Sequence, residues 1–112
     1  MSTISWQDFD KVEMRVGRVQ GAIDFPEAHN PSYLLEIDFG PEIGRRKSAA
    51  AIAEFYDKGD LEGRLVVAVT NFPPKQIANH MSEVLTLAAV NKDGTLKLLE
   101  PAGEVELGAR IR

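Results

Sequence analysis

The chain has 112 residues, of which 44% are hydrophobic, and this length and composition allow one globular domain with a single core. It has no cysteine, which excludes disulfide bonds, thiolate catalysis and cysteine-based zinc sites, and with His29 and His80 as its only imidazoles we expect no metal and no cofactor. A net charge of -4 and an isoelectric point near 5.1 exclude the strongly basic character of a general duplex-DNA binder, for which a value above about 9 is usual.

The amino-terminal residues lack the basic-then-apolar pattern of a secretory signal, and no run of about 18 apolar residues could form a membrane helix. We therefore expect a cytoplasmic protein without membrane insertion. Trp6 and Phe9 precede the first predicted strand, where they could either cover one end of the fold or anchor a subunit contact.

The first strand is predicted by alternating apolar residues at Val12, Met14 and Val16. Apolar positions resume at Val19 with the opposite parity, so we expect one extra residue, as a β-bulge or sharp bend, near residues 17–18. A strand that bends midway can serve two sheets or curl into a barrel.

Residues 25–31 predict a loop bounded by two prolines, and residues 33–39 alternate apolar and polar side chains as a half-buried strand does. Residues 45–48 predict a short strand that leads into a helix over residues 49–56, because that stretch is rich in helix formers. Residues 57–60 are expected to end this helix.

Residues 65–69 are a nearly continuous run of mostly β-branched apolar residues, as in a strand buried on both faces. A polar loop over residues 71–81, which contains two prolines, separates it from a strand over residues 84–90. Asp93-Gly94 favours a hairpin turn, from which residues 95–99 return as the partner strand.

The carboxy-terminal tail, residues 105–111, keeps apolar side chains to its end, so we expect it to be docked, either closing its own barrel or pairing with a second copy. Five or six strands, one short helix between the third and fourth, and a bent first strand predict an all-β protein. The arrangement fits a small closed or nearly closed β-barrel, the oligonucleotide/oligosaccharide-binding (OB) fold of five main strands with terminal extensions, in a single domain over residues 1–112.

No residue pattern supports catalysis. Ser82 near His80 is the closest approach to a nucleophile with a base, and the pairs Asp8 with Asp10 and Asp57 with Asp60 have the spacing of solvated surface carboxylates. We therefore expect a protein that is not an enzyme.

Arg45-Arg46-Lys47 is the only run of three basic residues, and on a strand Arg45 and Lys47 share one face. Such a cluster can simply keep an edge strand soluble. The functional alternative is contact with phosphate groups, which would draw on further side chains: Arg15 or Arg18, Lys75, and the hydroxyls of Ser48 and Ser82. The two serines are equally consistent with a helix cap and a turn.

Five segments in matching order and spacing resemble a known family: MRVGRV (14–19), FPEA (25–28), LEIDFG (35–40), NFPP (71–74) and SEVL (82–85). They look like the tRNA-binding domain family, and in particular like its small free-standing bacterial branch of chaperone-type, export-related proteins. The resemblance extends over essentially the whole chain.

The resemblance implies an OB fold, a homodimer formed with help from the terminal segments, and recognition of tRNA by its shape and phosphates, without catalysis. For the free-standing branch it also implies binding of unfolded or export-bound polypeptides in hydrophobic pockets near the dimer interface. The positions that match the family's nucleic-acid face are Arg45, Lys47, Ser48, Lys75 and Ser82.

The loop over residues 75–81 departs from the family pattern, with Gln76 and Met81 where cations are usual. This departure makes Phe72, Ile77 and Met81 candidates for an apolar groove, since flexible methionine suits varied partners. On the resemblance and the basic run of residues 45–47, the leading hypothesis is a tRNA-binding protein that uses phosphate contacts and can also act as a chaperone. The alternatives are a peptide-binding export chaperone with little RNA binding, and a subunit whose OB face binds one other protein.

Overall fold

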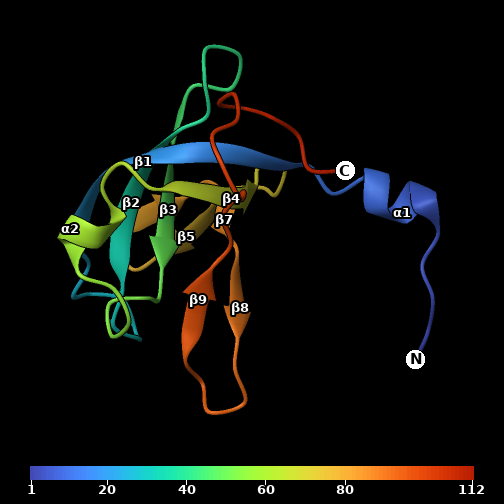
Figure 1. The fold of residues 1–112 in the computed structure, drawn as a ribbon. Coiled ribbons are helices and arrows are strands. Elements are labelled where there is room, and N and C mark those ends of the chain that lie inside the picture. Colours follow the sequence, from blue (N-terminus) through green and yellow to red (C-terminus); the bar gives the residue numbers. More distant parts are fainter.

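Five antiparallel strands curl into a nearly closed barrel in a computed structural model that describes residues 1–112 (Figure 1). They follow the order β3-β2-β1-β4-β7, with the bounds β1 Met14–Asp24, β2 Tyr33–Asp38, β3 Arg45–Ala50, β4 Leu65–Val69 and β7 Leu85–Thr86. The opening between β3 and β7 is bridged by the Glu83 N–H, which donates to the Lys47 carbonyl at 2.8 Å. The predicted all-β OB fold is confirmed.

Two small hairpins lie outside this sheet. β5 (Lys75–Ile77) pairs with β6 (His80–Ser82), so the segment that the sequence predicts as a loop is a hairpin instead. β8 (Ala88–Val90) pairs with β9 (Leu96–Leu98), and this second hairpin projects from the barrel (Figure 1).

The turn of the β8–β9 hairpin has the predicted Asp-Gly chemistry, with Gly94 at a φ of +89°. The Thr95 N–H and hydroxyl donate to the Asp93 carboxylate at 3.0 and 2.7 Å. These two hydrogen bonds favour the charged carboxylate and so hold the pKa of Asp93 below its usual value. The bond from the Thr95 backbone N–H has the larger effect, and the bond from the hydroxyl comes next. The predicted hairpin is therefore confirmed.

Two short helices complete the chain, α1 (Trp6–Asp10) and α2 (Lys58–Leu61). α1 is capped by the Ser5 hydroxyl, which accepts from the Asp8 N–H at 3.0 Å, yet α1 buries none of its residues and lies apart from the barrel (Figure 1). Neither helix is long and apolar enough to cross a membrane.

The prediction of a helix over residues 49–56 is wrong. β3 continues through Ala50, because Ala49 and Ala50 pair with Leu34 and Tyr33 of β2. Helix propensity is a weak preference, and here the neighbouring strand β2 offers backbone partners along the whole of β3. The helix between the third and fourth strands instead begins after Asp57, in the segment that was expected to end it.

The bulge of β1 also lies elsewhere than predicted. The ladder of β1 with β4 runs in register through residues 14–18, and the shift occurs between Val19 and Gly21, in the pairing with β2. The parity of apolar residues changes earlier because this half of β1 is buried on both faces. Val19 packs inside the barrel, whereas Val16 packs on the opposite face.

The carboxy-terminal tail covers that opposite face, where Leu107 and Ile111 pack against the cluster around Val16. The Ile111 N–H donates to the Met14 carbonyl, and the Val16 N–H to the Ala109 carbonyl, both at 2.9 Å. The prediction that the tail is docked is thus confirmed, and within this chain the tail pairs with β1.

Candidate functional site

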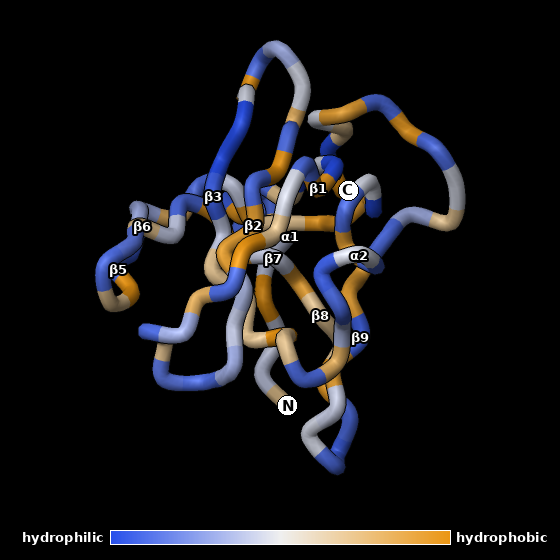
Figure 2. The backbone as a smooth tube through the Cα atoms, turned by 90° about the vertical axis from the view of Figure 1, so that its left-hand side faces the viewer, coloured by the Kyte–Doolittle hydropathy of each residue, from blue (hydrophilic) through white to orange (hydrophobic).

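The outer face of β2 and β3 is the surface on which OB folds most often bind ligands, together with the neighbouring loops. Directly paired residues of antiparallel strands present their side chains on the same face. The registers therefore set two parallel rows on this outer face, which we call the OB face: Gly21, Glu36 and Lys47 in one, and Ile23, Leu34 and Ala49 in the other. The β5–β6 hairpin lies beside β3 (Figure 2).

The basic run of β3 divides between the two sides of the strand. Arg45 and Lys47 are exposed on the OB face, while Arg46 shares the parity of the buried residues and is half-buried. Arg45 pairs with Glu36 of β2, at 2.9 Å between Nη1 and Oε1. The Arg46 guanidinium donates to the Arg45 carbonyl at 3.1 Å.

Lys47 and Lys75 differ from the other cations near this face. Both side chains are exposed, and neither takes part in any of the six ion pairs of the protein. A lysine without a carboxylate partner can contact a phosphate group without first breaking an ion pair. These two ammonium groups are thus the cations most available to an anionic ligand.

Ser48 and Ser82 hold the seam of the barrel. Ser48 is fully buried, and its hydroxyl accepts from the Thr86 hydroxyl at 2.8 Å. The Ser82 hydroxyl accepts from the Ala49 N–H at 3.0 Å and donates to the Val84 carbonyl at 3.3 Å. In this arrangement Ser48 does not reach the surface, and the Ser82 hydroxyl already has two partners.

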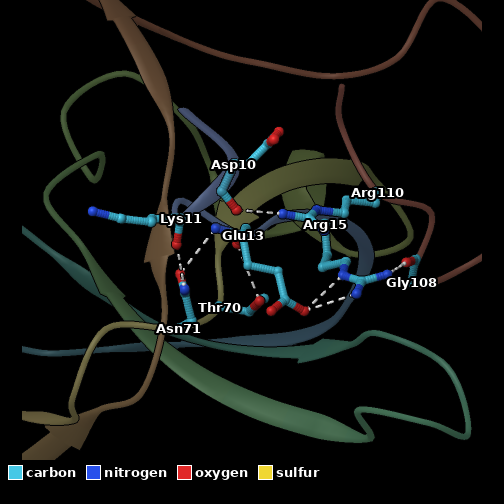
Figure 3. Close-up of polar contacts among 8 residues, drawn as sticks. All are labelled: Asp10, Lys11, Glu13, Arg15, Thr70, Asn71, Gly108 and Arg110. Carbon is cyan, nitrogen blue, oxygen red and sulfur yellow. Dashed lines mark hydrogen bonds and ion pairs between the residues drawn. The ribbon is translucent and has the colours of Figure 1, made fainter. Parts of the chain in front are cut away.

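Arg15 and Arg18 lie on β1 and are bound within the protein. Arg15 pairs with Glu13 at 2.8 Å and donates to the Gly108 carbonyl at 2.9 Å (Figure 3). Arg18 pairs with Glu104 at 2.8 Å and donates to the Gly63 carbonyl at 2.7 Å. Their charges fasten the amino-terminal half of β1 to its surroundings, which sequence reasoning could not distinguish from phosphate contacts.

An apolar groove of about 390 Å³ borders β3 and the β5–β6 hairpin. The apolar part of its lining consists of Ala49, Phe72, Pro73, Ile77, Val84 and Leu85. The polar residues Lys75, Ser82 and Glu83 also border it. Phe72 and Ile77, two of the three residues predicted for an apolar groove, thus line the same groove. Met81 is exposed but does not line the groove, and Leu85 was not foreseen.

Asn71 holds the beginning of the loop that carries Phe72 (Figure 3). Its side-chain amide donates to the Lys11 carbonyl at 2.7 Å and accepts from the Glu13 N–H at 2.9 Å. Thr70 donates to the Glu13 carbonyl through both its N–H and its hydroxyl. The segment before β1 and the edge of the apolar groove are therefore joined through one residue, a role that no local pattern indicates.

Comparison with known proteins gives consistent relatives. The family model described as "Putative tRNA binding domain" matches residues 14–110. The crystal structure of a CsaA chaperone protein from Picrophilus torridus is 47% identical with a TM-score of 0.92, covering 98% of this chain and all (100%) of that one. The chaperone CsaA from Bacillus anthracis is 42% identical with a TM-score of 0.93, covering 99% of this chain and 100% of that one.

A curated relative, the methionine–tRNA ligase of Thermococcus onnurineus, is 37% identical over 109 residues. The match covers 97% of this chain but only 14% of the ligase, so the chain spans about one seventh of the length of that relative. The resemblance that the five sequence segments indicate is confirmed.

Proposed function

The chain belongs to the tRNA-binding domain family, and from this premise we propose that it is a non-enzymatic protein of CsaA type that binds tRNA by shape and phosphate contacts. The observation that carries the proposal is the pair of exposed, unpaired ammonium groups of Lys47 and Lys75 beside the OB face. Arg45 and Arg46 extend the same basic strand. We also propose a cytoplasmic location, in keeping with a tRNA partner.

The small number of free cations limits the strength of this binding. The net charge is -4, and Arg15 and Arg18 are engaged elsewhere. Two to four phosphate contacts give a slope of log K against log salt of about -1.5 to -3.5, at roughly 0.7 to 0.9 per contact. We therefore expect tRNA binding that is measurable at low salt and weak at physiological salt.

A fluorescence anisotropy titration with total tRNA at about 50 and 200 mM salt tests the proposal. The double variant Lys47→Gln with Lys75→Gln should lower the magnitude of the salt slope by about 1.4 to 1.8, because two phosphate contacts are lost. The matched control is Lys92→Gln with Lys97→Gln, which removes two equal charges from the exposed β8–β9 hairpin.

Equal loss in both double variants would mean that the protein attracts tRNA only through its overall charge. Absence of binding at 50 mM salt would contradict tRNA binding altogether. In that case the peptide-binding function becomes the leading one.

The apolar groove favours that second function, binding of unfolded or export-bound polypeptides. Phe72 and Leu85 leave 52% and 48% of their surface exposed, so a hydrophobic peptide segment could cover both. Phe72→Ala should weaken suppression of the aggregation of a denatured client while leaving the tRNA salt slope unchanged. Val90→Ala is the control, since Val90 is 70% exposed but lies outside the groove; an equal loss in both variants would argue against the groove.

We also propose a homodimer that uses the terminal segments. Ile4 and Trp6 are 71% and 87% exposed, and α1 buries none of its residues against its own chain. Burying such large apolar side chains favours association. Sedimentation equilibrium measures it directly, and a monomer at micromolar concentration would contradict it.

A further inference from the structure

A small cavity on the OB face is separate from the apolar groove, and of its lining residues the proposed function uses only Lys47. It has a volume of about 260 Å³ and lies where β1, β2 and β3 meet the β5–β6 hairpin. Its lining includes Gly21, Ile23, Leu34, Glu36, Lys47 and His80. The cavity is smaller than the roughly 300–1,000 Å³ of pockets for drug-sized ligands, so it suits a single ring system.

Gly21 has no side chain and so leaves the floor of this cavity open, although the fold does not require a glycine at this position. A Cβ at Gly21 would meet no atom within 4 Å, and its φ does not lie in the left-handed region that favours glycine. The bulge beside Gly21 therefore does not require it either. A glycine in a strand weakens the sheet, and one without a packing reason marks a place where a ligand can approach the backbone closely.

The walls combine apolar side chains with the imidazole ring of His80. Ile23 is 57% exposed, and Leu34 is its cross-strand neighbour. The His80 ring contacts the Phe25 ring edge to face, with centroids 5.1 Å apart and an interplanar angle of 87°. This contact fixes how the imidazole ring is presented, and His is among the side chains on which unstacked RNA bases stack.

Two polar groups lie beside one another in the cavity, on the paired residues Glu36 and Lys47. Glu36 uses Oε1 for the ion pair with Arg45, which partly offsets its charge and leaves its second oxygen as an acceptor. A carboxylate accepts from the amino group of a base edge, while the ammonium group of Lys47 attracts a phosphate group. A phenylalanine side chain of a peptide would fill the same space but offer no polar group to the second Glu36 oxygen or to Lys47.

We propose that this cavity binds one unpaired nucleobase of an RNA strand, with the adjoining phosphate on Lys47. The base lies against Ile23 and the His80 ring, and its edge faces Glu36. A base inside a duplex has both faces covered, so the pocket selects loops and ends. The inference rests on the proposed RNA-binding function and names the part of the RNA that this face recognises.

The test is a ¹⁵N–¹H NMR titration with single-stranded RNA hexamers of adenosine, cytidine or uridine. We expect the amide signals of Gly21, Ile23 and His80 to shift with at least one hexamer. Gly21→Val, which fills the cavity and suits a strand, should weaken that binding roughly 5- to 150-fold, the range of one stacked base. The control Gly103→Val adds the same side chain at another glycine with open surroundings.

A second variant, His80→Ala, should weaken binding in the same way, and His80→Phe should restore most of it because a ring is retained. Circular dichroism checks that each variant is folded. In a parallel titration with tRNA, Gly21→Val should lower affinity without changing the salt slope, because no phosphate contact is removed.

Several outcomes overturn the proposal: hexamer affinity equal in Gly21→Val and Gly103→Val, equal shifts with a fully paired RNA hairpin, or shifts of these signals only with an aromatic peptide. Adenosine monophosphate binding as tightly as the hexamer would assign the pocket to free nucleotides instead. These results are distinguishable from failure of tRNA binding. If hexamer binding depends on Gly21 but the Lys47 and Lys75 variant leaves the tRNA salt slope unchanged, only the tRNA proposal fails. If that variant lowers the salt slope but hexamer binding does not depend on Gly21, only the nucleobase pocket fails.

Discussion

The two halves of β1 differ in how completely the rest of the protein covers them. The first half, residues 14–18, pairs with β4 and the tail, so that both faces are buried and Arg15 and Arg18 have partners. The second half, residues 21–24, pairs with β2, and its outer face is left open beside the unpaired Lys47. The comparison teaches that the surroundings of a cation or a glycine, rather than its residue type, decide whether it serves structure or binding.

The largest loss of stability should follow from adding a side chain at Gly17, in the covered first half of β1. A Cβ there would lie 2.5 Å from Ile37 Cγ2 and 2.8 Å from the Phe39 ring, inside the barrel. We expect Gly17→Val to lower the free energy of unfolding by about 3 kcal/mol, the upper end of the usual cost of overpacking. Urea denaturation measures it, and an unchanged midpoint would show that the barrel interior can make room.

A smaller effect should follow from releasing the segment before β1. Asn71→Ala removes the two hydrogen bonds to the backbone of Lys11 and Glu13. Because Asn71 is exposed and water can replace part of these bonds, we expect a loss of about 1 kcal/mol. Asn91→Ala is the control, since that side chain makes a single local bond to Thr95 in an exposed turn; equal losses would contradict the special role of Asn71.

The smallest effect is expected in the open half. Gly21→Ala places a methyl group in free space, in a strand where glycine is unfavourable. The free energy of unfolding should stay equal or rise by up to about 1 kcal/mol. A loss comparable to that of Gly17→Val would mean that Gly21 is required by the fold, and it would remove the main argument for a ligand there.

The course of the chain was predictable where local chemistry decides it. The alternation in residues 33–39, the Asp93-Gly94 turn and the docked tail all appear in the structure. The helix over residues 49–56 was predicted wrongly because alanine-rich composition favours a helix only until a neighbouring strand supplies backbone partners.

The candidate site was predictable in its residues more than in their roles. The sequence brings Lys47 and Lys75 into consideration together with Arg15, Arg18 and Ser48. Nothing in the sequence indicates that Arg15 would pair with Glu13 and the tail, or that Ser48 would be buried against Thr86. Such partners are far apart along the chain, and only the folded barrel brings them into contact.

The sequence by itself determined the fold class, because strand periodicity and turn residues are local properties, and its resemblance in five segments indicated the family. The tertiary structure alone decided which cations are free, which glycine is crowded and which is open, and where an apolar groove and a small cavity form. These are properties of packing between strands that are distant in sequence. Their physical cause is that hydrogen bonding and burial depend on which groups meet in space.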